Sequence, residues 1–126
     1  MAKQVLIVED SETCAETLVI ALESIPDVEL RVIHSAASAL EALREGLNEV
    51  AAIVTDLNLD HSRDNGFDLI RQLRAEPRFA GLPVLLISGD TDPRLPEDAL
   101  AQGADAFFAK PYSPLAVRKK LEQLLC

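Results

Sequence analysis

Chemically useful side chains follow the short apolar runs of this sequence. Glu9 and Asp10 come directly after the first run, Asp56 follows the third, Ser88 ends the fourth and Lys110 follows the fifth. Carboxylates that lie within several Å of one another repel, and two or more hard oxygen ligands favour a divalent cation such as Mg²⁺. A bound cation would in turn favour an anion, which a hydroxyl and an ammonium could hold. These residue types therefore predict a cation and anion site, provided that the runs end side by side.

The apolar runs alternate with helical patterns, which predicts strands that alternate with helices in one α/β domain. Continuous apolar runs are typical of strands covered on both faces of a parallel sheet, whereas residues 28–34 alternate apolar and polar side chains, as an edge strand does. The predicted strands span residues 4–8, 28–34, 51–55, 82–88 and 105–109. In a doubly wound sheet of this kind, ligands bind beyond the carboxyl ends of the strands.

Capping residues and prolines delimit five predicted helices. The first begins after Ser11, carries Cys14 on an apolar stripe that runs on to Ile25, and ends at Pro26. The second predicted helix follows Ser35, and the third ends before Pro77. The fourth spans residues 96–102 and is closed by Gly103, and the fifth begins at Pro114. No repeat, low-complexity stretch or linker interrupts the pattern, so we expect residues 1–126 to form a single domain.

Composition excludes several classes of partner. The 126 residues include 21 acidic and 12 basic side chains, for a formal net charge of −9. That excess disfavours direct binding to nucleic acid or to an anionic membrane, both of which need clustered Lys and Arg. No apolar run is long enough to span a bilayer, and no signal peptide is recognisable. The two cysteines, Cys14 and Cys126, have no metal-ligand or disulfide spacing, so we expect a cytoplasmic, reducing setting.

The whole chain resembles the receiver domains of response regulators in two-component signalling, close to the single-domain chemotaxis (CheY-like) type. The resemblance is carried by the Glu9-Asp10 pair, Asp56, Ser88-Gly89, Lys110-Pro111 and Phe107, three residues before the lysine. It implies a flavodoxin-like (βα)5 fold with a five-stranded parallel sheet in the order 2-1-3-4-5. It also implies a phosphorylation-dependent switch in a phosphorelay, rather than an enzyme that turns over an external substrate.

Several roles follow from the resemblance alone. Asp56 would accept a phosphoryl group from a sensor histidine kinase or a histidine phosphotransfer protein. Asp10 and Asp56 would bind Mg²⁺ directly, Glu9 mostly through water, and the backbone carbonyl of Asn58 would complete the protein ligands. Lys110 would pair with the phosphoryl oxygens, aimed by a cis peptide bond to the following proline.

The resemblance also implies how the switch works. The hydroxyl of Ser88 would move toward the phosphoryl group, and Phe107 would turn into the space released. This would remodel the face formed by the fourth helix, fifth strand and fifth helix, which a downstream protein would read. The same face could form a homodimer. Phe107 has an alternative interpretation as an ordinary core aromatic beside Phe108.

The loop after Asp56 departs from the family pattern. Gly66 arrives ten residues after the aspartate instead of eight, and Asp60 stands where proline is usual. A neutral insertion is the default for residues 59–65. A functional alternative is that His61, Ser62 or Arg63 lies over the site and tunes partner choice or phosphate lifetime.

Two other functions remain open at the level of sequence. A pseudo-receiver adaptor would keep the fold without regulated phosphorylation, and the altered loop keeps this alternative open. A haloacid-dehalogenase-type phosphatase also uses a strand-end aspartate. That family needs a second acid two residues on, where this chain has Asn58.

Overall fold

A computed structural model describes residues 3–45, 50–59 and 64–125; for residues 64 and 65 it describes the backbone only. Strands and helices alternate along this part of the chain. Their order is β1 (Lys3–Val8), α1 (Glu12–Leu22), β2 (Val28–Ile33), α2 (Ala36–Arg44), β3 (Val50–Asp56), α3 (Asp64–Ala75), β4 (Val84–Ser88), α4 (Leu95–Gln102), β5 (Ala106–Ala109) and α5 (Pro114–Leu125).

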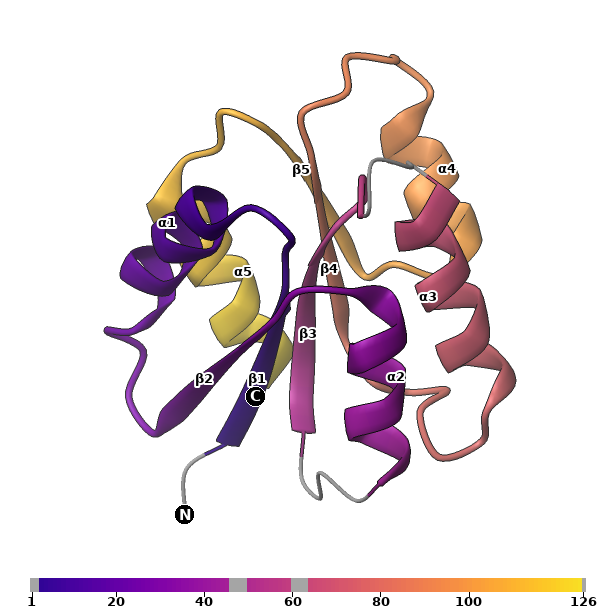
Figure 1. Ribbon diagram of the computed structural model, residues 1–126. Coiled ribbons are helices and arrows are strands. Elements are labelled where there is room, and N and C mark those ends of the chain that lie inside the picture. The colour runs from indigo at the N-terminus through magenta and orange to yellow at the C-terminus, as the bar shows by residue number, and fades with distance from the viewer. Residues whose placement is uncertain (1–2, 46–49, 60–63, 126) are drawn as a thin grey trace.

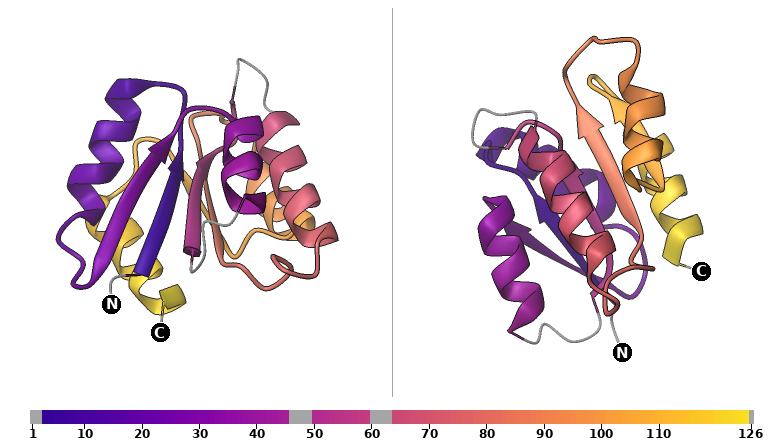
Figure 2. Two further views of the ribbon diagram at one scale, coloured as in Figure 1. Left: turned by 60° about the horizontal axis from the view of Figure 1, so that its bottom comes forward. Right: turned by 90° about the vertical axis from the view of Figure 1, so that its right-hand side faces the viewer.

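The strands form one parallel sheet in the order β2-β1-β3-β4-β5, which confirms the predicted doubly wound architecture. Helices α1 and α5 cover one face of this sheet, and α2, α3 and α4 cover the other (Figure 1). The left view in Figure 2 shows the same three layers, and the right view looks onto the face that α2, α3 and α4 cover. β2 lies at one edge, as its alternating pattern predicts.

Alternate residues of the central strands enter two separate apolar cores. Leu6 and Val8 of β1 pack on the α2–α3–α4 side, whereas Val5 and Ile7 pack on the α1–α5 side. Because both faces are covered, neither set can be polar, and the strand therefore reads as a continuous apolar run. No helix in the described part of the chain has the length and apolar content to cross a bilayer.

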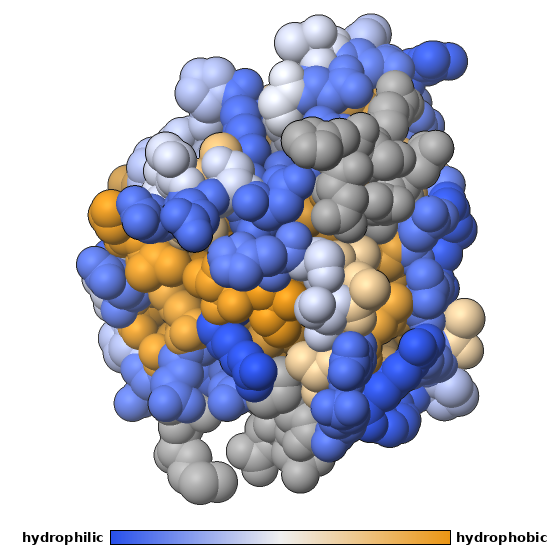
Figure 3. Space-filling model, in the orientation of Figure 1, coloured by the Kyte–Doolittle hydropathy of each residue, from blue (hydrophilic) through white to orange (hydrophobic). Residues whose placement is uncertain are grey.

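The edge strand leaves an apolar surface partly open. Val28, Leu30 and Val32 of β2 are only half-buried, and Ile20 on α1 is largely exposed. Figure 3 shows an apolar patch in the region of α1 and β2 on the face of the molecule turned to the viewer. The sheet ends at β2, so no further strand or helix covers this side among the described residues.

Two features of the first predicted helix are wrong. The helix ends at Leu22 and not at Pro26, because a residue before proline avoids the helical conformation and the chain turns early. Ile25 still enters the core from this turn, while Ala15 occupies the buried position that the stripe assigned to Cys14. The thiol instead lies half-buried on the side of α1 nearest the carboxyl ends of the strands.

Other element limits shift by one or two residues. β4 begins at Val84 and not at residue 82, since Pro83 has no N–H to donate to a neighbouring strand. Ser11 and Ser35 cap α1 and α2 as predicted: their hydroxyls accept the N–H groups of Cys14 and Ser38. Gly103 closes α4 with a left-handed φ of 111°.

Gly66 sets how closely α3 approaches the end of β3. Its backbone N–H donates to the carbonyl of Leu57, with an N···O distance of 3.0 Å. A Cβ atom at this glycine would lie 2.6 Å from the Cα atom of Leu57, which is closer than real contacts allow. Only glycine therefore fits where α3 packs against the residue that follows Asp56.

We expect Gly66→Ala to lower the free energy of unfolding by about 1–3 kcal/mol, because the added methyl group meets backbone that cannot move aside alone. Gly81→Ala is the matched control, since nothing lies within 4 Å of the position that its added methyl group would take; it should change the stability by less than about 1 kcal/mol. Urea unfolding of both variants measures the difference. Equal effects would contradict the close approach.

Candidate functional site

Backbone hydrogen bonds continue the sheet beyond its strands and align the predicted site residues. The N–H of Glu9 donates to the carbonyl of Ile33 (2.9 Å), and the N–H of Lys110 donates to the carbonyl of Ser88 (2.8 Å). The N–H of Leu57, directly after Asp56, donates to Ile87 in the same way. Since all strands run parallel, these residues meet at one edge of the sheet, as the sequence predicts.

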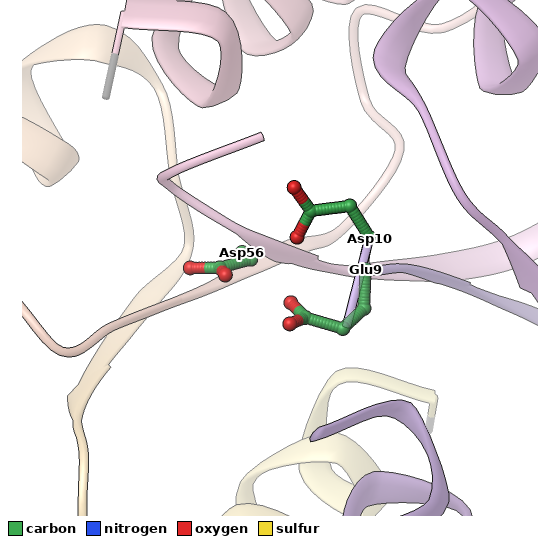
Figure 4. A group of neighbouring side chains, drawn as sticks. All are labelled: Glu9, Asp10 and Asp56. Carbon is green, nitrogen blue, oxygen red and sulfur yellow. The ribbon is translucent and has the colours of Figure 1, made fainter. Parts of the chain in front are cut away.

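Three carboxylates come together at this edge. One oxygen from each of Glu9, Asp10 and Asp56 lies within 4.8 Å of the others. Figure 4 shows the side chains converging from the ends of β1 and β3. Glu9 is 1% exposed and Asp56 is 6% exposed, while Asp10 is partly open to solvent. Burial weakens the screening of their mutual repulsion by water.

Lys110 provides the positive charge facing this cluster. Its Nζ atom lies 3.5 Å from Oδ2 of Asp56 and 3.9 Å from Oε1 of Glu9. The peptide bond to Pro111 is cis, as the resemblance implied. Burial opposes the charged form of the amine, but the nearby carboxylates outweigh this and raise the pKa of Lys110. The ammonium is therefore held in its charged state beside Asp56.

The segment after Asp56 and the end of β4 contribute polar groups as well. The backbone N–H of Asn58 donates to Oδ1 of Asp56, at 3.3 Å. Ser88 is fully buried, and its Oγ atom accepts the N–H of Asp90 at 3.0 Å. Asp56 is thus fixed from one side by backbone and from the other by the ammonium of Lys110.

The residues present fit a divalent cation. Oε2 of Glu9 is buried and has no hydrogen-bond partner among the described residues. A buried carboxylate oxygen without a partner is costly unless a cation or a proton offsets its charge. Together with Asp10 and Asp56 it forms an all-oxygen donor set, which is the set that Mg²⁺ prefers.

Comparison with known proteins agrees with this geometry. The sequence profile of the response regulator receiver domain matches residues 5–122. The chain belongs to the response regulator receiver family. It is 26% identical to the chemotaxis protein CheY1 of Helicobacter pylori strain J99, over 97% of this chain and 96% of that protein.

Solved receiver structures have the same architecture. The signal receiver domain of a signal transduction histidine kinase from Syntrophus aciditrophicus superposes with a TM-score of 0.85 and 31% identity, covering 98% of this chain and 90% of that one. The chemotaxis response regulator CheY4 of Vibrio cholerae, at 22% identity, has a TM-score of 0.83 and covers 99% and 100% of the two chains, which supports the fold. This chain is thus a CheY-like receiver domain of two-component signalling.

Two further predictions concern β5 of the receiver. Phe107 and Phe108 face opposite layers: Phe107 packs against the α2–α3–α4 core and Phe108 against the α1–α5 core. Both rings are half-buried. Phe107 therefore lies on the face of the sheet where α4 packs, as a switch aromatic would, and its movement stays a prediction.

Sequence reasoning missed two contacts of this receiver. The Sγ atom of Cys14 lies 3.6 Å from Nζ of Lys110, a contact that an i, i+4 stripe on one helix cannot reveal. Nδ1 of His34 donates to the carbonyl of Glu9 at 3.1 Å, which joins the residue after β2 to the residue after β1. The predicted roles of His61, Ser62 and Arg63 fall outside the described residues.

Glu9 is the most strongly perturbed acid of the site. Burial, together with its interaction with Asp56, raises its pKa from 4.5 to about 8, with Asp10 adding to the effect and Lys110 opposing it. Between these pH values the folded state binds more protons than the unfolded state, so stability falls as the pH rises.

We therefore expect the free energy of unfolding, measured with a chelator present, to decrease between about pH 5 and pH 8. Glu9→Gln, which cannot ionise, should flatten this dependence. Glu16→Gln, an exposed acid on α1, is the matched control and should keep it. Urea unfolding across this pH range measures all three proteins. A parent and a Glu9→Gln variant with parallel pH profiles would contradict the assignment.

Proposed function

We propose that this receiver domain is a phosphorylation-dependent signalling switch, in which Asp56 accepts a phosphoryl group from a sensor histidine kinase or a histidine phosphotransfer protein. The observation that supports this most directly is the position of the Asp56 carboxylate. It belongs to an acidic cluster that fits a cation, and the Lys110 ammonium lies 3.5 Å from it. Phosphoryl transfer needs this combination of positioning and charge neutralisation more than it needs acid–base chemistry.

In this proposal Asp10 and Asp56 bind Mg²⁺ directly, Glu9 acts through water, and the backbone carbonyl of Asn58 completes the set. When bound, Mg²⁺ supplies positive charge against the phosphoryl oxygens during transfer. The proposal is supported by the short separation of the carboxylates and by the unpaired oxygen of Glu9.

The chain's own groups would then act as follows. A carboxylate oxygen of Asp56 forms a bond to phosphorus while the bond from phosphorus to the donor's imidazole nitrogen breaks, and the imidazole retains the electron pair. Lys110 donates hydrogen bonds to the phosphoryl oxygens, and the hydroxyl of Ser88 donates another. The domain promotes only its own phosphorylation and dephosphorylation, so it is not an enzyme in the ordinary sense.

The output of the switch follows from two residues at the ends of β4 and β5. Ser88 exchanges its contact with the N–H of Asp90 for the phosphoryl group, and Phe107 moves into the released space. A ligand that binds one arrangement better shifts the population toward it. The remodelled α4–β5–α5 face is then read by a downstream protein, or by a second copy in a homodimer. We further propose that residues 1–126 act as one domain in the cytoplasm.

Asp56→Asn should abolish modification by a small phosphodonor. Intact mass after incubation with Mg²⁺ and acetyl phosphate should show one added phosphoryl group in the parent and none in this variant. Asp27→Asn is the matched control, because Asp27 is exposed where β2 begins and has a φ of 60° that asparagine tolerates. It should be modified like the parent.

Other outcomes would favour the alternatives. A parent without an adduct, and without any response to beryllium fluoride, would favour a pseudo-receiver adaptor. Steady turnover of phosphate esters would favour a phosphatase.

Lys110→Met should lower the extent of phosphorylation at limiting acetyl phosphate by roughly tenfold to a hundredfold, since a charge-assisted hydrogen bond contributes about 1.5–3 kcal/mol. Lys119→Met removes the same charge from an exposed position of α5 and should leave the extent close to that of the parent. Quantitative intact mass at several donor concentrations compares the three proteins. Equal losses in both variants would point to net charge and not to the contact with Asp56.

A further inference from the structure

A small cavity lies beside the candidate site, between α1 and the segment that leads from β5 into α5. Its volume is about 210 Å³, and Glu9, Cys14, Thr17, Lys110, Pro111 and Tyr112 are among the residues that line it. The cavity shares Glu9 and Lys110 with the site around Asp56. A molecule or a modification inside it would therefore contact the groups that face the phosphoacceptor.

Cys14 is the nucleophilic group of this cavity. Its side chain is half-buried, so it can be reached from solvent, and its Sγ atom lies 3.6 Å from Nζ of Lys110. A cysteine side chain that solvent can reach is open to oxidation by peroxide to a sulfenic acid. The reaction described for Asp56 makes no use of this thiol.

A second buried polar group, Glu9, lies among the residues that line this mostly apolar cavity. Oε2 of Glu9 lies in a side chain that is 2% exposed, and it has no hydrogen-bond partner in the described part of the chain. A buried carboxylate oxygen without a partner can accept an O–H donor. Hydrogen peroxide has two such donors and is small enough for the cavity, so it could bind there while the thiol attacks.

We propose that Cys14 is a site of reversible oxidation by peroxide, and that its oxidised side chain draws Lys110 away from Asp56 and lowers phosphorylation. The proposal rests on the proposed function of Asp56. In the reaction, sulfur attacks one peroxide oxygen, an S–O bond forms and the O–O bond breaks. The hydroxide released takes the proton of the thiol and leaves as water, so sulfur loses two electrons to the peroxide and becomes a sulfenic acid.

The consequence for Lys110 follows from the acceptors around it. In the reduced protein the ammonium faces Asp56 at 3.5 Å, a sulfur atom at 3.6 Å and Glu9 at 3.9 Å. Thiol sulfur is a weak acceptor, whereas the oxygen of a sulfenic acid accepts N–H groups at ordinary distances near about 2.9 Å. The new oxygen projects from sulfur toward the same cavity and competes with Asp56 for the ammonium.

The process is reversible by a thiol reductant. A first thiol displaces water from the sulfenic acid and forms a mixed disulfide, and a second thiol releases the reduced Cys14. Peroxide would thus suppress phosphorylation without altering Asp56 itself. Phosphorylation of Asp56 and oxidation of Cys14 would then both act through the ammonium of Lys110.

The experiment uses a Cys126→Ser background, which leaves Cys14 as the sole thiol of the chain. The matched control is Cys14→Ser with Cys126 retained. Each protein is treated with hydrogen peroxide, trapped with dimedone and analysed by intact and peptide mass. Parallel samples, reduced or oxidised and free of excess peroxide, are then incubated with Mg²⁺ and acetyl phosphate.

We expect one dimedone adduct on Cys14 and a fall in phosphorylation of about tenfold or more, as the loss of one charged hydrogen bond implies. Dithiothreitol should restore the phosphorylation. The ratio of oxidised to reduced phosphorylation should stay at one in Cys14→Ser.

Each contrary result has a distinct meaning. If Cys14 stays unlabelled under conditions that label the same protein unfolded in urea, the oxidation site is overturned. Labelling with unchanged phosphorylation overturns the link to Lys110. A reduced protein that takes up no phosphoryl group overturns the proposed function and with it this link, whereas the labelling result still decides whether Cys14 is oxidised.

Discussion

Repulsion among three carboxylates is the constraint on which this receiver depends. Glu9, Asp10 and Asp56 approach within 4.8 Å at the carboxyl edge of the sheet, and two of the three are buried. Lys110 offsets part of this charge, while burial, together with the interaction with Asp56, raises the pKa of Glu9 to about 8. A cation that binds to the cluster stabilises the folded protein, and its charge in turn favours the binding of a negatively charged phosphoryl group.

The scaffold keeps the repelling groups together because backbone bonds hold the strand ends in register. The N–H groups of Glu9 and Lys110 continue the sheet beyond β1 and β5, and Gly66 brings α3 against the residue after Asp56. Two well-filled apolar cores on either side of the sheet resist any spreading of the strands. Packing energy distributed over the whole domain therefore maintains an unfavourable arrangement at one edge, as functional sites commonly require.

Lys110 is the point where several influences on Asp56 meet. Its ammonium contacts two carboxylates of the cluster and the sulfur of Cys14. Because these partners lie at similar distances, a small chemical change in one of them can shift the ammonium from one partner to another. A chemical change in the cavity beside α1 can therefore alter how strongly the Lys110 ammonium offsets the negative charge of Asp56.

The order and type of the elements, and the residues at the strand ends, were determined by the sequence itself, because apolar periodicity and capping are local and each strand end carries its own side chain. The resemblance added the strand order and the cis bond before Pro111, both present in the structure. Tertiary structure alone decided how α1 rotates on the sheet: Ala15 turns inward and Cys14 turns toward Lys110. It also decided which oxygen of Glu9 stays unpaired. These features depend on distances between segments remote in the chain, and such distances arise only when both cores pack.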